Sequence, residues 1–240
     1  QKPVKKFTNY LEMLEDSQLD GVVICTPDTT HKEIALECIK HKKHIILEKP
    51  IATTLEDSIA IYNAAKDYQK TFCLGFVLRY TNFYRAIKQL ILDGAIGNII
   101  TVEAKETLDY IHGSSFFRRW HRDKNTNGGL INAKCSHDMD ILNWLIDKTP
   151  LYISSFGGLS HFKKMDEFTV NCDDCSKSDS CIYNYNNIDY GDYLPIEHNC
   201  VYNIEKSIVD HQVVIVEYEN NVTASFTLTA ISSEENRSLI

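Results

Sequence analysis

The stretch Gly21-Val22-Val23-Ile24-Cys25-Thr26-Pro27-Asp28-Thr29-Thr30 decides the fold of this chain. Its apolar half predicts a buried strand, and its polar half predicts a turn into a helix that ends near residue 42. The same alternation then continues with a strand over 44–47, a helix over 54–68 and a strand over 71–77. Short apolar strands that alternate with helices predict βαβ units and a parallel sheet.

The pattern changes after residue 79. Longer strands are expected over 99–108, 152–156, 213–218 and 222–229, with a helix over 129–146, a loop over 109–127 and an unpaired segment over 232–240. We therefore predict an α/β fold in two parts. Residues 1–78 form a partial doubly wound, Rossmann-like parallel sheet, and residues 79–240 form an α+β domain with an open, mostly antiparallel sheet that we expect to be C-terminally incomplete.

Composition excludes several classes of protein. The hydrophobic share of 43%, the charged share of 24% and the net charge of -8 are typical of a globular domain and argue against a nucleic-acid partner. The sequence has no apolar run of the ~18 residues that a membrane helix needs, and its first residues lack the apolar stretch that is typical of a signal peptide. We expect a cytoplasmic protein with a small-molecule ligand, and neither a nucleic-acid nor a membrane partner.

The tripeptide Glu48-Lys49-Pro50 follows a predicted buried strand directly. Ligands of open α/β sheets bind at the carboxyl ends of the strands, and a desolvated Lys there can act as a general base. The alternative is a surface ion pair that precedes a helix.

Further motifs strengthen the first interpretation. They are Thr26-Pro27 with His31, Gly75-Phe76-Val77-Leu78-Arg79-Tyr80, Gly94-Ala95-Ile96-Gly97, and Gly128-Gly129-Leu130 with His137-Asp138-Met139-Asp140. Together with Glu48-Lys49-Pro50, this series resembles the Gfo/Idh/MocA oxidoreductases. The resemblance covers residues 10–229, but the chain contains no GxGxxG turn of the kind that binds dinucleotide phosphates.

The resemblance implies an oxidoreductase that transfers a hydride between NAD or NADP and a hydroxyl-bearing carbon of a sugar, sugar derivative or cyclitol. It implies proton transfer by Lys49 and His137. It also implies a cofactor site made of Thr26, Pro27, His31, Glu48, Lys49 and Arg79. Ala133 departs from the family pattern, which has Asp or Glu four residues before the helix histidine. A carboxylate there would lie on the same helix face as His137, and Ala cannot replace it.

A second cluster, Phe116 to Arg122, combines aromatic rings with arginines. Aromatic faces cover sugar rings and Arg donates to hydroxyls, so we predict a substrate site. Its members are Arg118, Arg119, Trp120 and His121, with Lys134 and Asp138 from the following helix. The alternative is a basic loop whose aromatic rings are anchored in the core.

Four cysteines fall in one predicted insertion. Cys172-x2-Cys175-x5-Cys181, with His198 and Cys200 downstream, is compatible with a zinc site, but the spacing is irregular. Free thiols and disulfides stay open as alternatives. Since hydride transfer needs no metal, we predict none.

Two other functions stay open. One is an NAD-dependent glycosidase that oxidises its sugar transiently and eliminates the leaving group, and the other is a non-catalytic sugar-binding or scaffold protein. We expect a homodimer or homotetramer, because the outer face of the second sheet needs cover. We also expect these 240 residues to bind NAD(P) weakly, because the glycine-rich turn lies outside them.

Overall fold

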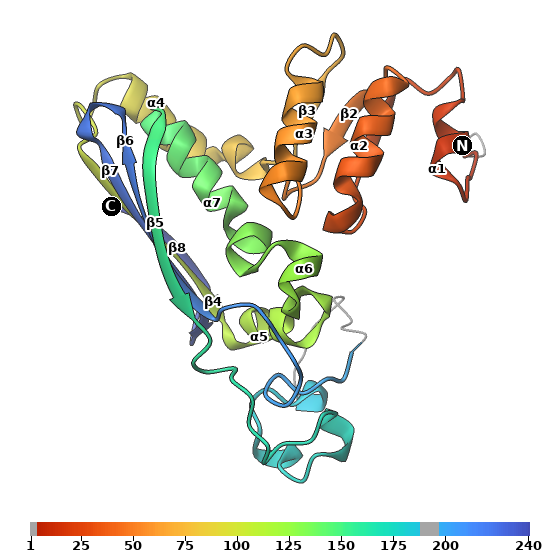
Figure 1. The fold of residues 1–240 in the computed structure, drawn as a ribbon. Helices are drawn as coiled ribbons and strands as arrows, with labels where there is room; N and C mark the ends of the chain where they lie inside the picture. The colour runs from red at the N-terminus through yellow and green to blue at the C-terminus, as the bar shows by residue number, and fades with distance from the viewer. Residues whose placement is uncertain (1–3, 188–196) are drawn as a thin grey trace. The chain divides into compact units, whose positions relative to one another are not determined.

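The computed structural model describes residues 4–187 and 197–240 (Figure 1). The chain forms two compact units, unit 1 over residues 1–76 and unit 2 over residues 77–240. The boundary lies two residues before the predicted one. No helix in the described part of the chain is both long and apolar enough to span a membrane.

Unit 1 contains a parallel sheet of three strands in the order β1-β2-β3. Its elements, in chain order, are α1 (Tyr10–Leu14), β1 (Gly21–Ile24), the 3-10 turn η1 (Asp28–Thr30), α2 (His31–Lys40), β2 (His44–Leu47), α3 (Leu55–Ala65) and β3 (Phe72–Leu74). Gly21 lies opposite His44, and Ile45 lies opposite Phe72. The predicted parallel, Rossmann-like sheet is confirmed.

Local sequence explains where these helices begin and what they cover. Thr54 caps α3, because its side chain accepts a hydrogen bond from the backbone N–H of Asp57. The alternating apolar positions of β1 and β2 put Ile24, Ile45 and Leu47 into the core of unit 1, where α2 contributes Ala35 and α3 contributes Ile61. The sheet is therefore held to its helices by aliphatic packing.

Unit 2 contains a five-stranded sheet in the order β5-β6-β7-β4-β8. Its strands are β4 (Thr101–Asp109), β5 (Pro150–Gly158), β6 (His211–Tyr218), β7 (Thr223–Ser232) and β8 (Asn236–Leu239). Only β4 and β7 pair in parallel, whereas the other three pairings are antiparallel. The mostly antiparallel sheet is thus as predicted.

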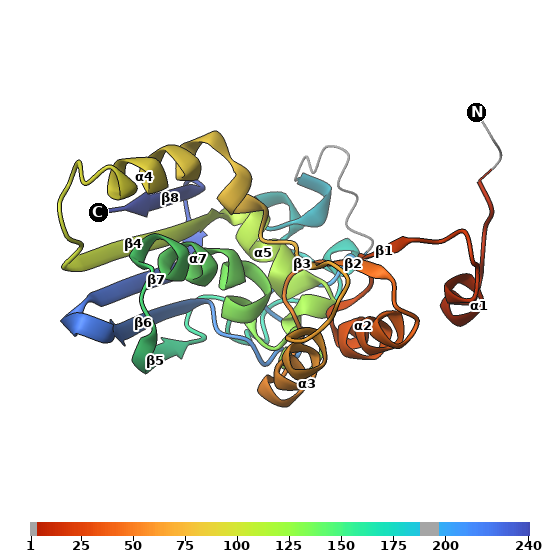
Figure 2. The same cartoon turned by 90° about the horizontal axis from the view of Figure 1, so that it is seen from above.

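The helices of unit 2 cover one face of this sheet, as Figure 2 shows from above. They are α4 (Asn82–Leu92), α5 (Tyr110–Arg118), α6 (Lys124–Asn127) and α7 (Leu130–Ile146), with short 3-10 turns at η2 (Val77–Tyr80), η3 (Trp120–Arg122) and, beyond β5, at η4 (Cys172–Asp174), η5 (Ser178–Ser180), η6 (Tyr185–Asn187) and η7 (Glu219–Asn221). Phe117, Leu142, Val214, Phe226 and Leu228 are buried between helices and sheet.

Two predictions for unit 2 were wrong. The segment 109–127 is largely helical, since Asp109 caps α5 by accepting from the N–H of His112 at 2.7 Å. The segment 232–240 does have a partner, because β8 pairs with β4, with Arg237 opposite Glu106. The long connection between β5 and β6 contains no strand or α-helix in its described residues, only 3-10 turns and one bridge between Asn171 and Asn199.

Candidate active site

Three loops meet at the carboxyl ends of the strands in unit 1. The first is the turn Thr26-Pro27 after β1, the second is Glu48-Lys49-Pro50 after β2, and the third begins with Gly75 after β3. Backbone hydrogen bonds continue the sheet into them, because the N–H of Glu48 donates to Ile24 O and that of Gly75 to Leu47 O. This is the edge at which open parallel sheets bind ligands.

His31 joins the first two loops. Its ring lies at 1% exposure, with Nδ1 2.8 Å from Pro50 O and Nε2 3.0 Å from Thr26 O. A side chain that is buried and engaged at both nitrogens holds the two loops together. Cofactor contact by His31 stays a prediction.

Glu48 is fixed on the floor of this edge. Its carboxylate lies over Gly75, where an added Cβ would stand 3.2 Å from all three carboxyl atoms. The same carboxylate accepts from the N–H of Lys49 at 3.2 Å. Glycine at position 75 therefore leaves room for the Glu48 side chain, and the half-buried carboxylate keeps acceptor capacity for a hydroxyl.

The charge of Asp28 depends on its neighbours at this edge. Burial raises the pKa of Asp28, whereas the positive charges of His31 and Lys49 act to lower it. Lys49 is thus close enough to the partly buried carboxyl group of Asp28 to affect its titration. The half-buried Glu48 precedes Lys49 in the same loop. The residues at this edge fit a bound nicotinamide ribose, since exposed Thr26 and Pro27 flank carboxylate and ammonium groups.

In unit 2 the helix α7 carries His137. Gly128 and Gly129 precede the helix with positive φ angles of 74° and 98°, a conformation that glycine adopts without strain. His137 is half-buried, whereas Ala133, one turn earlier, is buried at 4% exposure. The methyl group of Ala133 lies in the apolar core between helix and sheet, so it supplies no polar group toward the imidazole.

A network of buried charges lies beneath the same helix. Glu106 on β4 is fully buried, and Lys134 on α7 lies 3.2 Å from its Oε1. Arg237 on β8 pairs with Glu106 through its Nε and contacts Asp138 Oδ1 at 2.9 Å. Lys134 also lies 3.7 Å from Glu235. We call these five residues the buried ion network.

The network changes the titration of its carboxyl groups. Burial, helped by the negative charge of Asp138, raises the pKa of Glu106 to about 7, although Lys134 and Arg237 act in the opposite direction. Burial likewise raises the pKa of Asp138, against the effect of Arg237. Asp138, at 7% exposure, is part of this network, and its substrate contact stays a prediction. Substrate contact by Lys134 stays a prediction.

Arg118 also differs from expectation. Its side chain is fully buried and donates to Asn199 O at 2.7 Å, to Tyr183 O at 2.5 Å and to Cys172 Sγ at 3.3 Å. The predicted substrate contact is therefore corrected, because the guanidinium points into the insertion between β5 and β6. Sequence spacing could not show this, since its partners are 54 to 81 residues away.

Among the rest of this predicted cluster Phe116 and Phe117 are buried in the core, whereas Arg119 to Arg122 are partly buried. Trp120 stacks on His121 with ring centroids 3.7 Å apart, and Arg119 precedes them, also half-buried. Asn127 holds the segment in place by donating to His121 O and accepting from the N–H of Gly129. The structure thus joins Trp120 and His121 to the start of α7, while their substrate contacts stay a prediction.

Arg79 has a carboxylate partner in unit 2. Its Nε and Nη2 donate to the two carboxylate oxygens of Asp140 at 2.7 and 2.5 Å, an arrangement that fixes the η2 turn to α7. Its guanidinium also lies 5.8 Å from the ring of Trp144. Cofactor contact by Arg79 stays a prediction.

Both units match known families. Residues 2–76 match the model described as an oxidoreductase family with an NAD-binding Rossmann fold, and residues 84–240 match the GFO/IDH/MocA C-terminal domain. The chain belongs to the Gfo/Idh/MocA oxidoreductase family. The resemblance inferred from the motifs is therefore confirmed.

Curated relatives of the chain have different names and cover most or part of its length. The chain is 27% identical to the putative oxidoreductase YteT of Bacillus subtilis, over 90% of this chain and 56% of that protein. It is 31% identical to 2,7-anhydro-N-acetylneuraminate hydratase of Escherichia coli, over 63% of this chain and 40% of that protein. The chain thus spans about half the length of the curated relatives that it matches.

Solved structures confirm the fold. A levoglucosan dehydrogenase in complex with NADH superposes with a TM-score of 0.73 at 20% identity, covering 97% of this chain and 53% of that one. A probable dehydrogenase from Thermotoga maritima gives a TM-score of 0.69 at 16% identity, covering 97% and 57%. A Rossmann-like parallel sheet followed by a mixed sheet is therefore the architecture of this chain.

Proposed function

We propose that the protein is a nicotinamide-dependent oxidoreductase that acts on a hydroxyl-bearing carbon of a sugar, sugar derivative or cyclitol. The observation that carries this proposal is the strand edge of unit 1, where Glu48 and Lys49 stand beside the exposed turn Thr26-Pro27. The family match supports NAD or NADP as the cofactor. The expectation of a cytoplasmic protein without nucleic-acid or membrane partners stays a prediction.

The proposed roles follow from the chemistry of each group. The carboxylate of Glu48 accepts from a ribose hydroxyl, and Thr26 and Pro27 line the cofactor. When bound, the nicotinamide supplies the two-electron chemistry of the reaction. Lys49 takes the proton from the substrate hydroxyl, and His137 on α7 shares that transfer. Arg119, Trp120, His121 and Lys134 bind the sugar through donors and an aromatic face.

A Lys49→Ala variant tests this proposal. Loss of a general base lowers turnover about 100- to 10,000-fold, so we expect that loss in the natural protein when NAD(P)H formation is followed with cyclitols and sugars as substrates. Lys40→Ala, on the surface of α2, is the matched control and should keep its turnover. Near-normal turnover of Lys49→Ala, with both variants folded by circular dichroism, would show that Lys49 transfers no proton.

A reaction without net oxidation is the second candidate. One observation favours it, because a relative is named as a hydratase. In that case the substrate is oxidised transiently, a bond is eliminated and the cofactor is restored. Product without NAD(P)H accumulation, but only with cofactor present, would identify this class, whereas product without any cofactor would exclude both proposals.

We also propose that the protein assembles as a homodimer or homotetramer through the face of the unit 2 sheet that its helices leave open. The observation behind this is a group of apolar side chains on β5 and β6, which include Tyr152 at 70% and Phe156 at 76% exposure. Apolar surface of this extent is favourable to bury against a second copy.

A further inference from the structure

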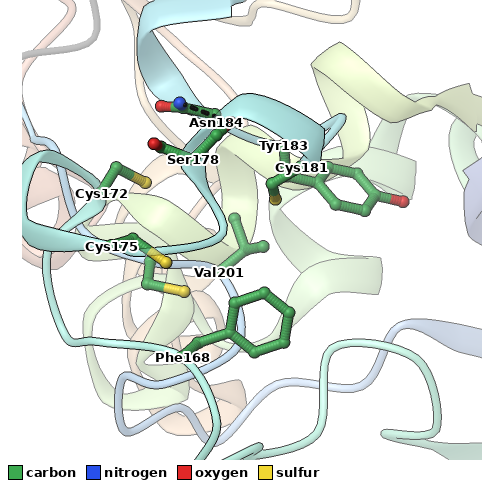
Figure 3. A pocket seen from close by; sticks show the side chains of 9 residues that line it. Phe168, Cys172, Cys175, Ser178, Cys181, Tyr183, Asn184 and Val201 are labelled. Carbon is green, nitrogen blue, oxygen red and sulfur yellow. Dashed lines mark hydrogen bonds between the residues drawn. The ribbon is translucent and has the colours of Figure 1, made fainter.

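Four cysteines of the insertion between β5 and β6 line one pocket. The pocket is shown in Figure 3, and its lining residues are Phe168, Cys172, Cys175, Ser178, Cys181, Tyr183, Asn184, Cys200 and Val201. We call the four cysteines the cysteine cluster. The sulfurs of Cys172, Cys175 and Cys181 are turned toward the same space. We propose that the cysteine cluster binds one structural zinc ion.

The backbone brings the four positions together. Asn171 and Asn199 form a bridge, in which Cys172 N–H donates to His198 O at 2.9 Å and Cys200 N–H donates to Val170 O at 2.8 Å. Cys172 and Cys200 therefore lie on two paired segments. The η4 turn then returns the chain at Cys175, whose N–H donates to Cys172 O, and η5 leads to Cys181.

The pocket has the size of a single ion. Its volume of about 10 Å³ is the space of about one water molecule. A cluster of several iron and sulfur atoms does not fit such a space, whereas one zinc ion with four thiolate ligands does. The nearby side chains of Phe168, Tyr183 and Val201 shield the site from water.

A buried cation beside the cluster points to negative charge on the sulfurs. The Arg118 side chain is fully buried, and its hydrogen-bond partners are two neutral carbonyls and Cys172 Sγ, at 3.3 Å. Among the described residues no carboxylate forms an ion pair with it, and its Nε–H has no acceptor, although the ring centroid of Tyr185 lies 5.9 Å from its guanidinium carbon. Burial of an uncompensated guanidinium is costly. Four thiolates with one Zn²⁺ carry a net charge of about -2, which this cation offsets in part.

The insertion between β5 and β6 also has little regular secondary structure to hold it in place, and a bound metal ion would link its segments. The described residues from 159 to 210 contain no α-helix and no strand beyond one isolated bridge, although segments of this length are uncommon in compact domains. A metal that ties the bridge to the two turns supplies the order that a small apolar core does not. Through Arg118 the site also anchors the end of α5, which leads into Trp120 and His121.

The proposal departs from our sequence-based prediction of no metal, and it requires a local adjustment. No group of three or more His, Cys, Asp or Glu side chains within residues 4–187 and 197–240 already stands in metal-binding geometry. The thiols must therefore rotate about their Cα–Cβ bonds to reach one point. Cysteine has a single side-chain torsion to its sulfur, so this rotation between staggered positions leaves the path of the backbone unchanged.

Metal analysis of the natural protein tests the proposal. We expect about one zinc per chain by mass spectrometric elemental analysis, retained after dialysis against a weak chelator. Cys175→Ser and Cys181→Ser should each lose the zinc. Cys73→Ser, a partly buried cysteine of β3 outside the cluster, is the matched control and should retain it.

The unmodified protein alone can overturn the proposal, so a variant that fails to fold does not obscure the result. Reconstitution of the reduced protein with Co²⁺ should give the visible absorption of tetrahedral cobalt thiolate. Four freely alkylated thiols with no bound metal, in protein purified under reducing conditions and supplied with Zn²⁺, would contradict it. Disulfides between cluster members, detected by peptide mapping after anaerobic alkylation, would contradict it as well.

Discussion

Glu106 is the fully buried carboxyl group of the ion network in unit 2. It lies on the central part of β4, fully buried, with Lys134 and Arg237 as its ion-pair partners. In the folded protein its pKa is raised from the ordinary value of 4.5 to about 7, first by burial and then by the carboxylate of Asp138. Its protonation state therefore changes in the physiological range of pH.

This shift predicts a pH dependence of stability. Between pH 4.5 and about 7 the folded state holds a proton on Glu106 that the unfolded chain has released. The stabilising contribution of the neutral carboxyl is thus fully present below pH 4.5 and is lost as the pH rises through about 7. Replacement by the neutral Gln removes this loss, so the free energy of unfolding of Glu106→Gln should fall less steeply with pH than that of the wild type.

Urea unfolding at several pH values across this window measures the difference. Glu103→Gln is the matched control, because Glu103 lies on the same strand but is exposed. Its pH profile should follow that of the wild type. Equal slopes for Glu106→Gln and the wild type would mean that Lys134 and Arg237 keep the carboxylate ionised throughout.

At the scale of elements, α5 depends on one close approach to the sheet. An added Cβ at Gly113 would stand 2.1 Å from Ala230 O on β7, which is backbone and cannot turn aside. Alanine is a better helix former than glycine by about 1 kcal/mol, so propensity alone would favour the substitution. Overpacking against a backbone atom costs about 1–3 kcal/mol and reverses that preference.

Gly113→Ala should therefore lower the free energy of unfolding, by up to about 2 kcal/mol after the gain in propensity is subtracted. Chemical denaturation of the wild type and of the variant gives this difference in the free energy of unfolding. Ser115→Ala on the same helix adds no atom and loses only a hydrogen bond to His112 O, so it should change stability less. An equal or greater stability of Gly113→Ala would show that α5 moves away from β7 freely.

The same elements show what the sequence could predict. The strands of unit 1 alternate with helices at regular spacing, and apolar periodicity identified them because burial is local in that pattern. Helix α5 was missed, since Gly113, Ser114 and Ser115 have low helix propensity and tertiary packing decides the outcome. Asp109, which caps the helix, was the one local signal.

The site was predictable to a similar degree. Motif matching indicated the strand edge with Glu48 and Lys49, because those residues are adjacent in sequence to a recognisable strand. It could not indicate the partnership of Glu106 with Arg237, which are separated by most of unit 2 and meet only through the pairing of β4 with β8. Non-local pairing is invisible to periodicity. For the same reason the burial of Arg118 was missed.

At the scale of the whole molecule, the two faces of the unit 2 sheet have different surroundings. One face packs on α5 and α7. On the other, Phe156 lies opposite Val213 on the neighbouring strand, at 76% and 40% exposure. Tyr152 and Ile215 extend the same apolar area along the two strands, at 70% and 53% exposure. Since edge strand β5 has no further partner among the described strands, both its rim and this face are open.

Burial of this area against a second copy predicts a self-associated protein with two-fold symmetry, because one apolar surface then meets its own equivalent. Light scattering of the natural protein should give a mass of two or four chains.

The variants Phe156→Lys and Ile215→Lys test which surface forms the contact. Each puts an unpaired charge into the apolar contact. Because burying such a charge is costly, each variant should shift the mass to that of one chain. Tyr62→Lys, at 64% exposure on α3 of unit 1, is the control and should leave the assembly intact. A single-chain mass for the unmodified protein at high concentration would contradict the proposal. An assembly that survives both charged variants would move the interface to another surface.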